Sequence, residues 1–383
     1  MKKVLVVSNA AHSGGVEISL INFIREIKKR TDINVKLLLV ENRGVYKEDF
    51  EKIIDVKQIQ FKNKAYDRCI SFKKLSITEK IIRLFLKMVQ KISTKAYMKC
   101  LLKNSLEYEE KVDLVIDYHG YGYFGTYYAA KKIHASNKIL FLHAREVEWI
   151  DKLGDIAYNY DYLFAVSNSC AELVRQSSNY FKNKIMIFHN ILDIENINKL
   201  AQEKINKTFD ESYFNILTIG RLEWEKGYDY VIEIAKQLKN KIKFRWYIIG
   251  SGKLEEQLVR EIKENNLDKN IIMLGFQRNP YPYLKKCDIY VQPSRNEGYG
   301  LAIAEARILK KPIIASKIDS ISEHVINGKT GVLLNLNVEE FSNEILKMYN
   351  DDNYRNSFIN YLEQNEDSQN DMNKIIKILE GEK

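Results

Sequence analysis

The chain has 383 residues, of which 45% are apolar, 29% are charged and only 4 are proline. That length and apolar content suit two globular domains with full cores and exclude a repetitive or low-complexity chain. No apolar run approaches the roughly 20 residues of a membrane-spanning helix, and the four cysteines show no close pairing. These features predict a reduced, cytoplasmic protein without a cysteine-based metal site.

The first half of the chain alternates short apolar strands with helical patterns. A strand is expected at 4–8, followed by a helix at 16–29, and the later strands are expected at 35–40, 114–117, 138–142 and 162–166. This alternation is typical of a parallel sheet with helices on both faces. Gly14 and Gly15 follow the first strand, where they suit either a close backbone approach to a phosphate or a simple tight turn.

The stretch 57–103 carries the positive charge. It contains thirteen Lys or Arg residues against two acidic ones, a net charge of +11 that exceeds the +9 of the whole chain. A helix is expected with Lys80, Arg83, Lys87 and Lys91 on one face and Ile81, Ile82, Phe85, Leu86, Val89 and Ile92 on the opposite face. Two interpretations stay open, a peripheral contact with an anionic membrane surface or a surface helix packed on its own sheet. Nucleic acid is not expected, since no recognisable binding module is present.

A second series of strands follows a polar stretch at 196–212. The strands are expected at 215–219, 244–249, 271–274, 289–291, 312–315 and 331–334, with helical patterns between them. The sequence therefore predicts an α/β fold of two doubly wound domains with a cleft between them, and a domain boundary near 195–210.

Charged residues and glycines cluster after two strands of this second half. Arg221 and Lys226 lie on the loop after the first strand, where they would either converge on a diphosphate or pair with neighbouring glutamates. Glu297 and Glu305 frame a glycine-bracketed turn after the strand at 289–291. This pair suits a site that holds hydroxyl groups at a helix start, although solvated helix carboxylates have the same spacing.

In order and spacing, these motifs resemble the family 4 retaining glycosyltransferases. The matching pieces are Ile219-Gly-Arg-Leu-x-x-x-Lys-Gly, Gly250-x-Gly252, Leu274-Gly275, Pro293-Ser294-x-x-Glu297-Gly-Tyr-Gly, Glu305-Ala306 and Glu323. The resemblance covers most of the chain and is strongest from about 215 to 334. It implies a GT-B architecture with an acceptor-binding Rossmann-like domain at 1–195 and a nucleotide-sugar-binding one at 196–360. A C-terminal helix at about 360–383 would pack back on the first domain.

The resemblance also implies roles for individual residues. Arg221 and Lys226 would neutralise the departing diphosphate, Glu297 would hold the transferred sugar and Glu305 the ribose. The implied catalytic residues are Arg221, Lys226, Glu297 and His143. The implied donor-binding residues are Gly14, Gly15, Gly220, Gly275, Glu297, Gly298, Tyr299, Gly300, Leu301 and Glu305. His119 and Glu17 would bind the acceptor, although a lone histidine at a strand end is often structural. No metal and no separate cofactor are implied.

The implied reaction is the retaining transfer of a hexose or N-acetylhexosamine from a nucleotide-diphosphate sugar. The donor is expected to be UDP-linked from family frequency, and the acceptor is a glycan or a lipid-diphosphate-linked glycan of cell-surface polysaccharide or capsule biosynthesis. That acceptor suits a cytoplasmic enzyme at the inner face of the plasma membrane. Two alternatives remain, a GT-B epimerase or hydrolase and a non-catalytic nucleotide-sugar-binding partner of another transferase. One departure from the family is Asp319-Ser320, which stands where a glycine pair is common.

Overall fold

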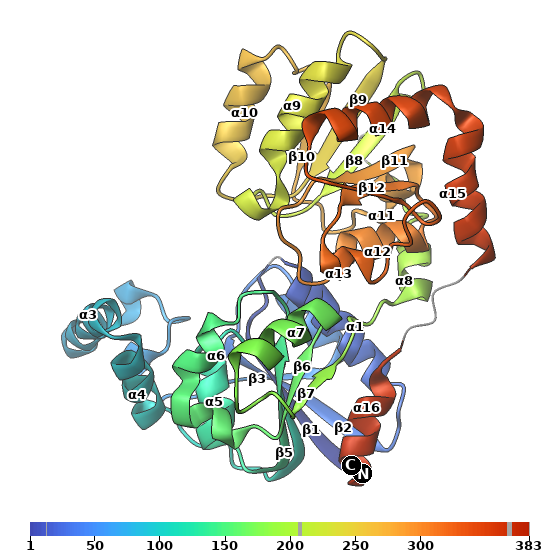
Figure 1. Ribbon diagram of the computed structural model, residues 1–383. Helices are drawn as coiled ribbons and strands as arrows, with labels where there is room; N and C mark the ends of the chain where they lie inside the picture. The colour runs from blue at the N-terminus through green and yellow to red at the C-terminus, as the bar shows by residue number, and fades with distance from the viewer. Residues whose placement is uncertain (13, 206–208, 366–369, 383) are drawn as a thin grey trace. The chain divides into compact units, whose positions relative to one another are not determined.

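The computed structural model describes residues 1–12, 14–205, 209–365 and 370–382. The chain divides into two compact units, the first made of Met1–Ile191 with Asn370–Lys383 and the second of Leu192–Gln369 (Figure 1). The sequence placed these divisions at 195 and about 360. In the structure, helix α15 (Asp352–Gln364) belongs to the second unit, and helix α16 (Met372–Glu380) belongs to the first.

The first unit is built on a seven-stranded parallel sheet with the order β3-β2-β1-β4-β5-β6-β7. Its strands are β1 (Lys2–Ala10), β2 (Ile33–Glu41), β3 (Asp55–Gln58), β4 (Val112–Asp117), β5 (Ala135–Leu142), β6 (Tyr162–Ala165) and β7 (Ile185–Ile187). In the centre of the sheet Val4 lies opposite Val35 on one side and Leu114 on the other. The two short edge strands β3 and β7 were not expected from the sequence.

Helices and short turns connect the strands of this first unit. The helices of the unit are α1 (Gly15–Ile27), α2 (Lys47–Ile53), α3 (Ile77–Ile92), α4 (Thr94–Asn104), α5 (Phe124–Lys132), α6 (Glu148–Leu153), α7 (Asn168–Ser177) and α16, with 3₁₀ turns η1 (Lys64–Tyr66), η2 (Phe72–Lys74) and η3 (Gly154–Asn159). Met372 and Ile375 of α16 are buried in the same apolar core as the central strands. Asp371 holds the start of α16, because its carboxylate accepts hydrogen bonds from the backbone N–H and the ring Nδ1 of His189, each at 2.8 Å.

The second unit contains a six-stranded parallel sheet with the order β10-β9-β8-β11-β12-β13. Its strands are β8 (Phe214–Ile219), β9 (Phe244–Ile249), β10 (Ile271–Gly275), β11 (Ile289–Gln292), β12 (Ile313–Ser316) and β13 (Val332–Leu334). Its helices are α8 (Ile194–Leu200), α9 (Tyr228–Leu238), α10 (Glu255–Glu264), α11 (Tyr281–Lys286), α12 (Leu301–Ile308), α13 (Asp319–Ser322), α14 (Val338–Asn350) and α15, and a 3₁₀ turn η4 covers Trp224–Lys226. Helix α8 lies where the sequence suggested only a polar linker.

In both sheets the order in which strands are added reverses next to the first strand. In the second unit the chain runs outward from β8 through β9 to β10 and then returns to place β11 on the other side of β8. The first unit does the same around β1 and β4. The loops at the carboxyl ends of the two strands diverge at such a point and leave a crevice where ligands bind. A ligand site is therefore expected at the residues after β8 and β11 in the second unit, and at those after β1 and β4 in the first.

No helix in the described part of the chain is long and apolar enough to cross a membrane.

Candidate functional site

An ion pair joins the loops that follow β8 and β11. Lys226 Nζ donates to both carboxylate oxygens of Glu297 at 2.7 Å. The Glu297 side chain is 8% exposed and that of Lys226 is 20% exposed, so the pair is largely withdrawn from water. The sequence left open a pairing of Lys226 with Glu223 or Glu225, but Glu223 instead faces Lys253 at 3.8 Å. The structure thus brings together two of the predicted catalytic residues at the switch point of the sheet.

A chain of buried hydrogen bonds orients Glu297. The Tyr290 hydroxyl donates to Gln292 Oε1 at 2.5 Å, and Gln292 Nε2 donates to Ser294 Oγ at 2.9 Å. Ser294 Oγ then donates to Glu297 Oε1 at 2.7 Å. The chain has one direction. The Glu297 carboxylate can only accept, so the Ser294 hydroxyl donates to it, and that hydroxyl oxygen in turn accepts from the Gln292 N–H₂ group, which can only donate. The carboxylate is therefore held from the β11 side by the hydroxyl and from the β8 side by the ammonium group.

Arg295 fastens the same two loops at a second point. Its guanidinium donates two hydrogen bonds to the Asp229 carboxylate, at 2.7 and 2.5 Å, and lies 3.5 Å from the ring centroid of Trp224. Its backbone N–H donates to the carbonyl of Glu225 at 2.7 Å. A bidentate arginine-carboxylate pair fixes distance and orientation together. The loop that carries Lys226 and the loop that carries Glu297 therefore form one connected structure.

Glycines allow the backbone to pack closely around this pair. Gly227 has φ +69°, and a Cβ atom there would lie 1.8 Å from the carbonyl oxygen of Pro293. Gly250 has φ +150°, and a Cβ atom there would lie 1.9 Å from the carbonyl oxygen of Gly220. Tyr228 donates to that same Gly220 carbonyl at 2.8 Å. Gly220 thus lies in the site loop, and Arg221, the next residue, is exposed beside it.

The predicted turn from Glu297 to Leu301 leads directly into helix α12. Gly300 precedes the helix with φ +85°, and Leu301 is its first residue. The first amides of a helix have no intrahelical acceptor and favour an anion. Gly298 and Tyr299 lie in the turn, and the Tyr299 carbonyl is 2.5 Å from His324 Nε2. Gly275, at the end of β10, has φ +67° and open space where a Cβ atom would stand.

Ser320 contributes a contact that a glycine would lack. It stands in α13 at the Asp319-Ser320 departure from the family pattern, and its hydroxyl donates to the backbone carbonyl of Glu297 at 2.7 Å. Ser320 is buried. The serine therefore fixes the backbone of Glu297, while Ser294 fixes its side chain.

Glu305 lies in the second turn of α12 and is buried. The Tyr281 hydroxyl donates to its Oε1 at 3.0 Å. Burial raises the pKa of Glu305 to about 7, although the Tyr281 hydrogen bond opposes that rise. Burial also raises the pKa of Tyr290 strongly, and both Glu297 and Glu305 add to that shift. The two carboxylates therefore lie within electrostatic reach of one tyrosine.

The raised pKa of Glu305 predicts a pH dependence of stability. The unfolded chain releases this proton near pH 4.5, whereas the folded chain keeps it to about pH 7. The stabilisation from proton uptake is therefore fully present below pH 4.5 and is lost as the pH rises through 7. Relative to Glu305→Gln, we expect the free energy of unfolding of the wild type to fall by roughly 3 kcal/mol between pH 4.5 and pH 8. The free energy of unfolding of both proteins is measured from denaturant curves at each pH. A difference between them that stays the same across this range would contradict the assignment.

In the first unit His143 is a buried neutral ring. Its Nε2 lies 2.6 Å from the Tyr118 carbonyl, which can only accept, so Nε2 carries the proton. Burial lowers the pKa of His143 to about 3, which leaves Nδ1 as a hydrogen-bond acceptor at neutral pH. The ring stacks on Phe141 at 5.6 Å. At neutral pH His143 can therefore accept a hydrogen bond at Nδ1, while its Nε2 proton is donated to the Tyr118 carbonyl.

The other predicted residues of the first unit follow β1 and β4. His119 Nδ1 lies 3.5 Å from Ser8 Oγ, and burial followed by the charge of His12 lowers the pKa of His119 to about 4. Gly15 begins α1, and a Cβ atom on Gly14 would lie 2.8 Å from Glu17 Oε2. Glu17 is itself buried. These residues belong to the switch point of the first sheet, whereas His143 follows the next strand, β5.

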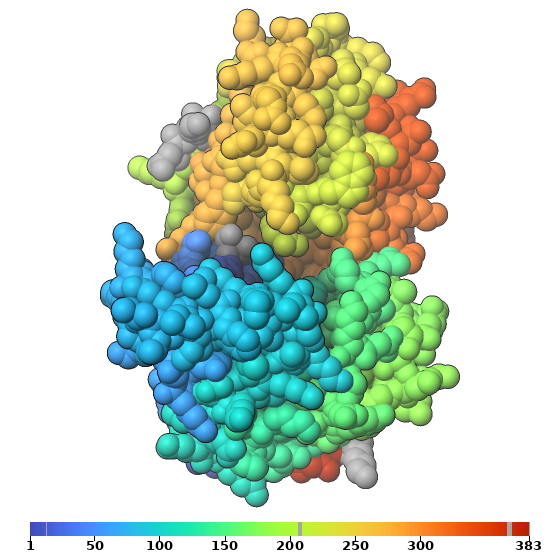
Figure 2. Space-filling model, turned by 90° about the vertical axis from the view of Figure 1, so that its left-hand side faces the viewer, coloured from blue at the N-terminus to red at the C-terminus, as the bar shows by residue number. Residues whose placement is uncertain are grey.

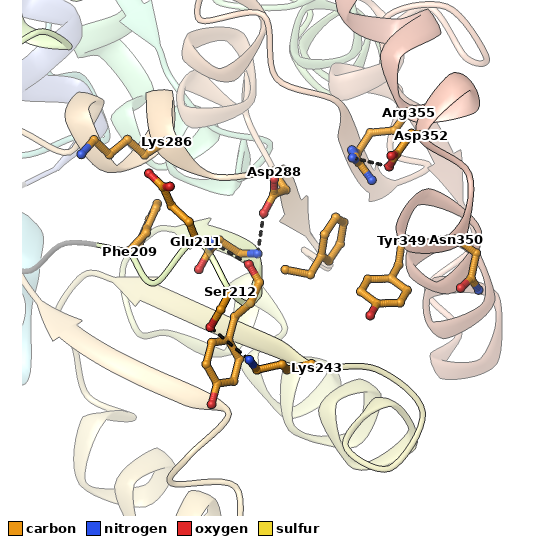
Figure 3. Close-up of a pocket in the computed structure, with 13 residues that line it drawn as sticks. Phe209, Glu211, Ser212, Lys243, Lys286, Asp288, Tyr349, Asn350, Asp352 and Arg355 are labelled. Atoms are coloured by element: carbon orange, nitrogen blue, oxygen red, sulfur yellow. Dashed lines mark hydrogen bonds and ion pairs between the residues drawn. The ribbon is translucent and has the colours of Figure 1, made fainter.

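A pocket of about 650 Å³ lies at the amino-terminal ends of the strands of the second sheet, away from the Lys226–Glu297 pair (Figure 3). Asn215 and Asp288, at the amino-terminal ends of β8 and β11, line it together with Lys243 and Arg355. The backbone N–H of Asn215 donates to Asp288 at 2.7 Å, so part of this lining is structural. None of the predicted site residues lines this pocket.

Sequence reasoning missed the residues that hold Glu297, Glu305 and their loops in place. They are Tyr281, Tyr290, Gln292, Ser294, Arg295 and Ser320. Tyr290, Gln292 and Ser294 recur at every second position, which places polar groups on one side of an otherwise apolar strand. That periodicity is the signal that would have found three of the six.

Comparison with known proteins gives a family match for part of the chain. Residues 201–365 match the family model described as glycosyl transferases group 1. An uncharacterized glycosyltransferase of Methanocaldococcus jannaschii is 26% identical over 262 residues, which are 58% of this chain and 64% of that protein. N-acetylgalactosamine-N,N'-diacetylbacillosaminyl-diphospho-undecaprenol 4-alpha-N-acetylgalactosaminyltransferase of Campylobacter jejuni is 29% identical over 202 residues, 52% of this chain and 54% of the relative.

The solved structures include HepE of Anabaena in complex with UDP and glucose. It matches with a TM-score of 0.69 and 17% identity over 95% of this chain and 94% of that one. The chain spans less than two thirds of the length of the two curated relatives above. The chain therefore has the GT-B fold, and its second unit carries the region that matches the glycosyl transferases of group 1.

Proposed function

We propose that the protein is a retaining glycosyltransferase that moves a hexose or N-acetylhexosamine from a UDP-linked donor to a glycan or lipid-diphosphate-linked acceptor. The observation that carries the proposal is the Lys226–Glu297 pair at the carboxyl ends of β8 and β11. A cation next to a hydroxyl-binding carboxylate suits a ligand with a diphosphate at one end and a sugar at the other. We place the reaction in surface-polysaccharide biosynthesis at the cytoplasmic face of the plasma membrane.

The second unit would hold the donor. Glu297 would accept hydrogen bonds from hydroxyls of the transferred sugar, and Glu305 from the ribose. The nucleotide-binding loops would include Gly220, Gly275 and the turn Gly298–Leu301. Lys226 and Arg221 would stand next to the diphosphate, with the amides of Gly300 and Leu301 at the start of α12. In the first unit His119 and Glu17 would bind the acceptor. The Gly14-Gly15 turn would bind the donor, and His143 would contact the transferred sugar.

The reaction would break the bond between the anomeric carbon and the diphosphate oxygen, with the bonding electrons leaving on the diphosphate. The acceptor hydroxyl oxygen would bond to the same face of the anomeric carbon, and its proton would pass to the departing phosphate oxygen. Lys226 and Arg221 would stabilise the negative charge that develops on this leaving group. No metal ion is part of this proposal, so chelation with EDTA is expected to leave the rate unchanged.

The relatives support the choice of substrates. The Anabaena structure contains UDP and glucose, and the name of the Campylobacter enzyme specifies a diphospho-undecaprenol acceptor and an α-linked product. These names support a UDP-sugar donor and an acceptor on a lipid diphosphate for this chain.

The experiment is a screen of nucleotide sugars by thermal shift, followed by product analysis with and without a lipid-diphosphate acceptor. A donor at a hundred times its dissociation constant adds about 2.7 kcal/mol, which is about 5 to 10 °C for a unit of this size. We expect a UDP-sugar to give this shift and nucleotide release to need the acceptor. Fast release or sugar isomerisation without acceptor would identify a hydrolase or epimerase, and binding without any turnover would identify a non-catalytic partner.

A further inference from the structure

Helix α3 exposes an apolar stripe that the protein itself leaves uncovered. Six of its large apolar side chains are between 50% and 77% exposed, namely Ile77, Ile81, Leu84, Phe85, Met88 and Ile92. Their spacing of i, i+4, i+7, i+8, i+11 and i+15 places all six on one side of the helix. An exposed apolar patch of this kind marks an interaction surface. The sequence left open whether this apolar side packs on the sheet of the protein, and for these six residues it does not.

The opposite side of α3 is fixed to the first unit. Leu86 is buried, and Arg83 donates hydrogen bonds to the backbone carbonyls of Lys64, Ala65, Asp67 and Ile70, at 2.5 to 3.0 Å. Arg83 therefore belongs to the packed side and is not part of an exposed basic face, which corrects the expectation from the sequence. A capping box of Ser76 and Glu79 closes the start of the helix. The exposed stripe is thus presented by an anchored helix.

Lysines border the stripe. Lys80, Lys87 and Lys91 lie along one edge of it by their helical spacing. The preceding turn η2 adds the exposed Lys73, Lys74 and Phe72, and Lys80 Nζ lies 5.8 Å from the ring of Phe72. Figure 2 shows this part of the first unit as light-blue to cyan atoms on the face turned to the viewer. The whole stretch 57–103 has thirteen basic and two acidic residues, so a partner for this surface would carry negative charge.

We propose that α3 docks the protein on an anionic lipid bilayer, with the six apolar side chains in the acyl-chain boundary and the lysines over the headgroups. Apolar side chains beside lysines on one helix are the pattern of a helix that lies in the plane of the interface. A helix that lies in this plane makes a peripheral contact. Docking would bring a lipid-linked acceptor to the first unit, but the contact itself needs neither donor nor acceptor.

The test is flotation of the full chain with vesicles of phosphatidylcholine containing about one third phosphatidylglycerol. We expect the wild type to float with these vesicles and not with phosphatidylcholine alone. Replacing Lys80, Lys87 and Lys91 by Gln should weaken binding about a hundredfold, since each lysine near an anionic surface contributes a factor of about five. The triple variant Ile81→Ser, Phe85→Ser, Met88→Ser should weaken it more than tenfold and abolish the binding that remains in high salt.

Matched controls lie on the second unit. Lys241, Lys263 and Lys269 are exposed lysines whose replacement by Gln removes the same charge from elsewhere, and Val259 and Ile326 are exposed apolar residues for replacement by Ser. These variants should bind vesicles as the wild type does. All variants should keep the unfolding midpoint of the wild type, because the side chains changed are exposed, apart from that of Lys80, which is half-buried. Equal flotation of the wild type and the apolar-stripe variant would overturn the proposal. A wild type that does not float but forms a dimer that this variant dissociates would also overturn it, and would identify a second copy of the chain as the partner.

Discussion

Replacing Lys226 by Ala is expected to lower kcat/KM for sugar transfer by a factor of a hundred to a thousand. The proposed role of Lys226 is to stabilise the charge that develops on the leaving diphosphate, and loss of one such preorganised donor costs about 3 to 4 kcal/mol of transition-state stabilisation. The measurement is initial rates with the donor found by the thermal-shift screen. Lys253→Ala is the matched control. The Lys253 side chain is 85% exposed, and its Nζ lies 3.8 Å from the carboxylate of Glu223, which is in the same loop as Lys226.

A charge swap separates catalysis from structure at this pair. Lys226→Glu with Glu297→Lys keeps opposite charges in contact but exchanges their places. If the pair acts only as a structural clamp, the swap should restore much of the activity lost in either single variant. The proposed roles predict no rescue, because the carboxylate would then face the diphosphate and the ammonium group the sugar. Recovery of activity in the double variant would contradict the proposed roles while leaving the ion pair itself in place.

Sequence reasoning found these residues but not their pairing. Apolar periodicity predicted β8 and β11, and glycine-rich turns after them predicted where the site lies. Lys226 and Glu297 are 71 positions apart. Their contact depends on β11 lying beside β8, with Ile289 opposite Ile216, and no local pattern encodes that register. The sequence offered nearer partners, Glu223 and Glu225, and the tertiary arrangement overrode them.

Helix α3 illustrates a different limit. Its amphipathic pattern was clear, but apolar residues occupy more than half of its circumference by helical spacing, so the pattern does not tell which part packs. In the structure the packed side is the one that carries Arg83, which donates hydrogen bonds to backbone carbonyls of the segment 64–70. Helix α8 was missed for a related reason. It is 7 residues long and rich in Asn, Lys and Glu, so its apolar residues Ile194, Ile197 and Leu200 cover too few turns to establish a helical period.

Replacing Gly227 by Ala is expected to separate the two site loops. Gly227 has φ +69°, which already costs a residue with a side chain about 1 kcal/mol, and the new Cβ atom would lie 1.8 Å from the Pro293 carbonyl oxygen. The backbone of one loop must therefore move. We expect a loss of about 3 kcal/mol or more in the free energy of unfolding, which lowers the unfolding temperature of the second unit by about 6 to 12 °C.

The matched control for this change is Gly328→Ala. Gly328 has φ +76° but open space where its Cβ atom would stand, so it shares the backbone strain of Gly227 without the collision. It should lose about 1 kcal/mol and keep full activity. Gly227→Ala should lose activity even at temperatures where it is folded, because Lys226 is the adjacent residue and Asp229, which pairs with Arg295, follows two positions later. Equal stability losses in the two variants would mean that the close approach of the loops at Pro293 is not what holds the site together.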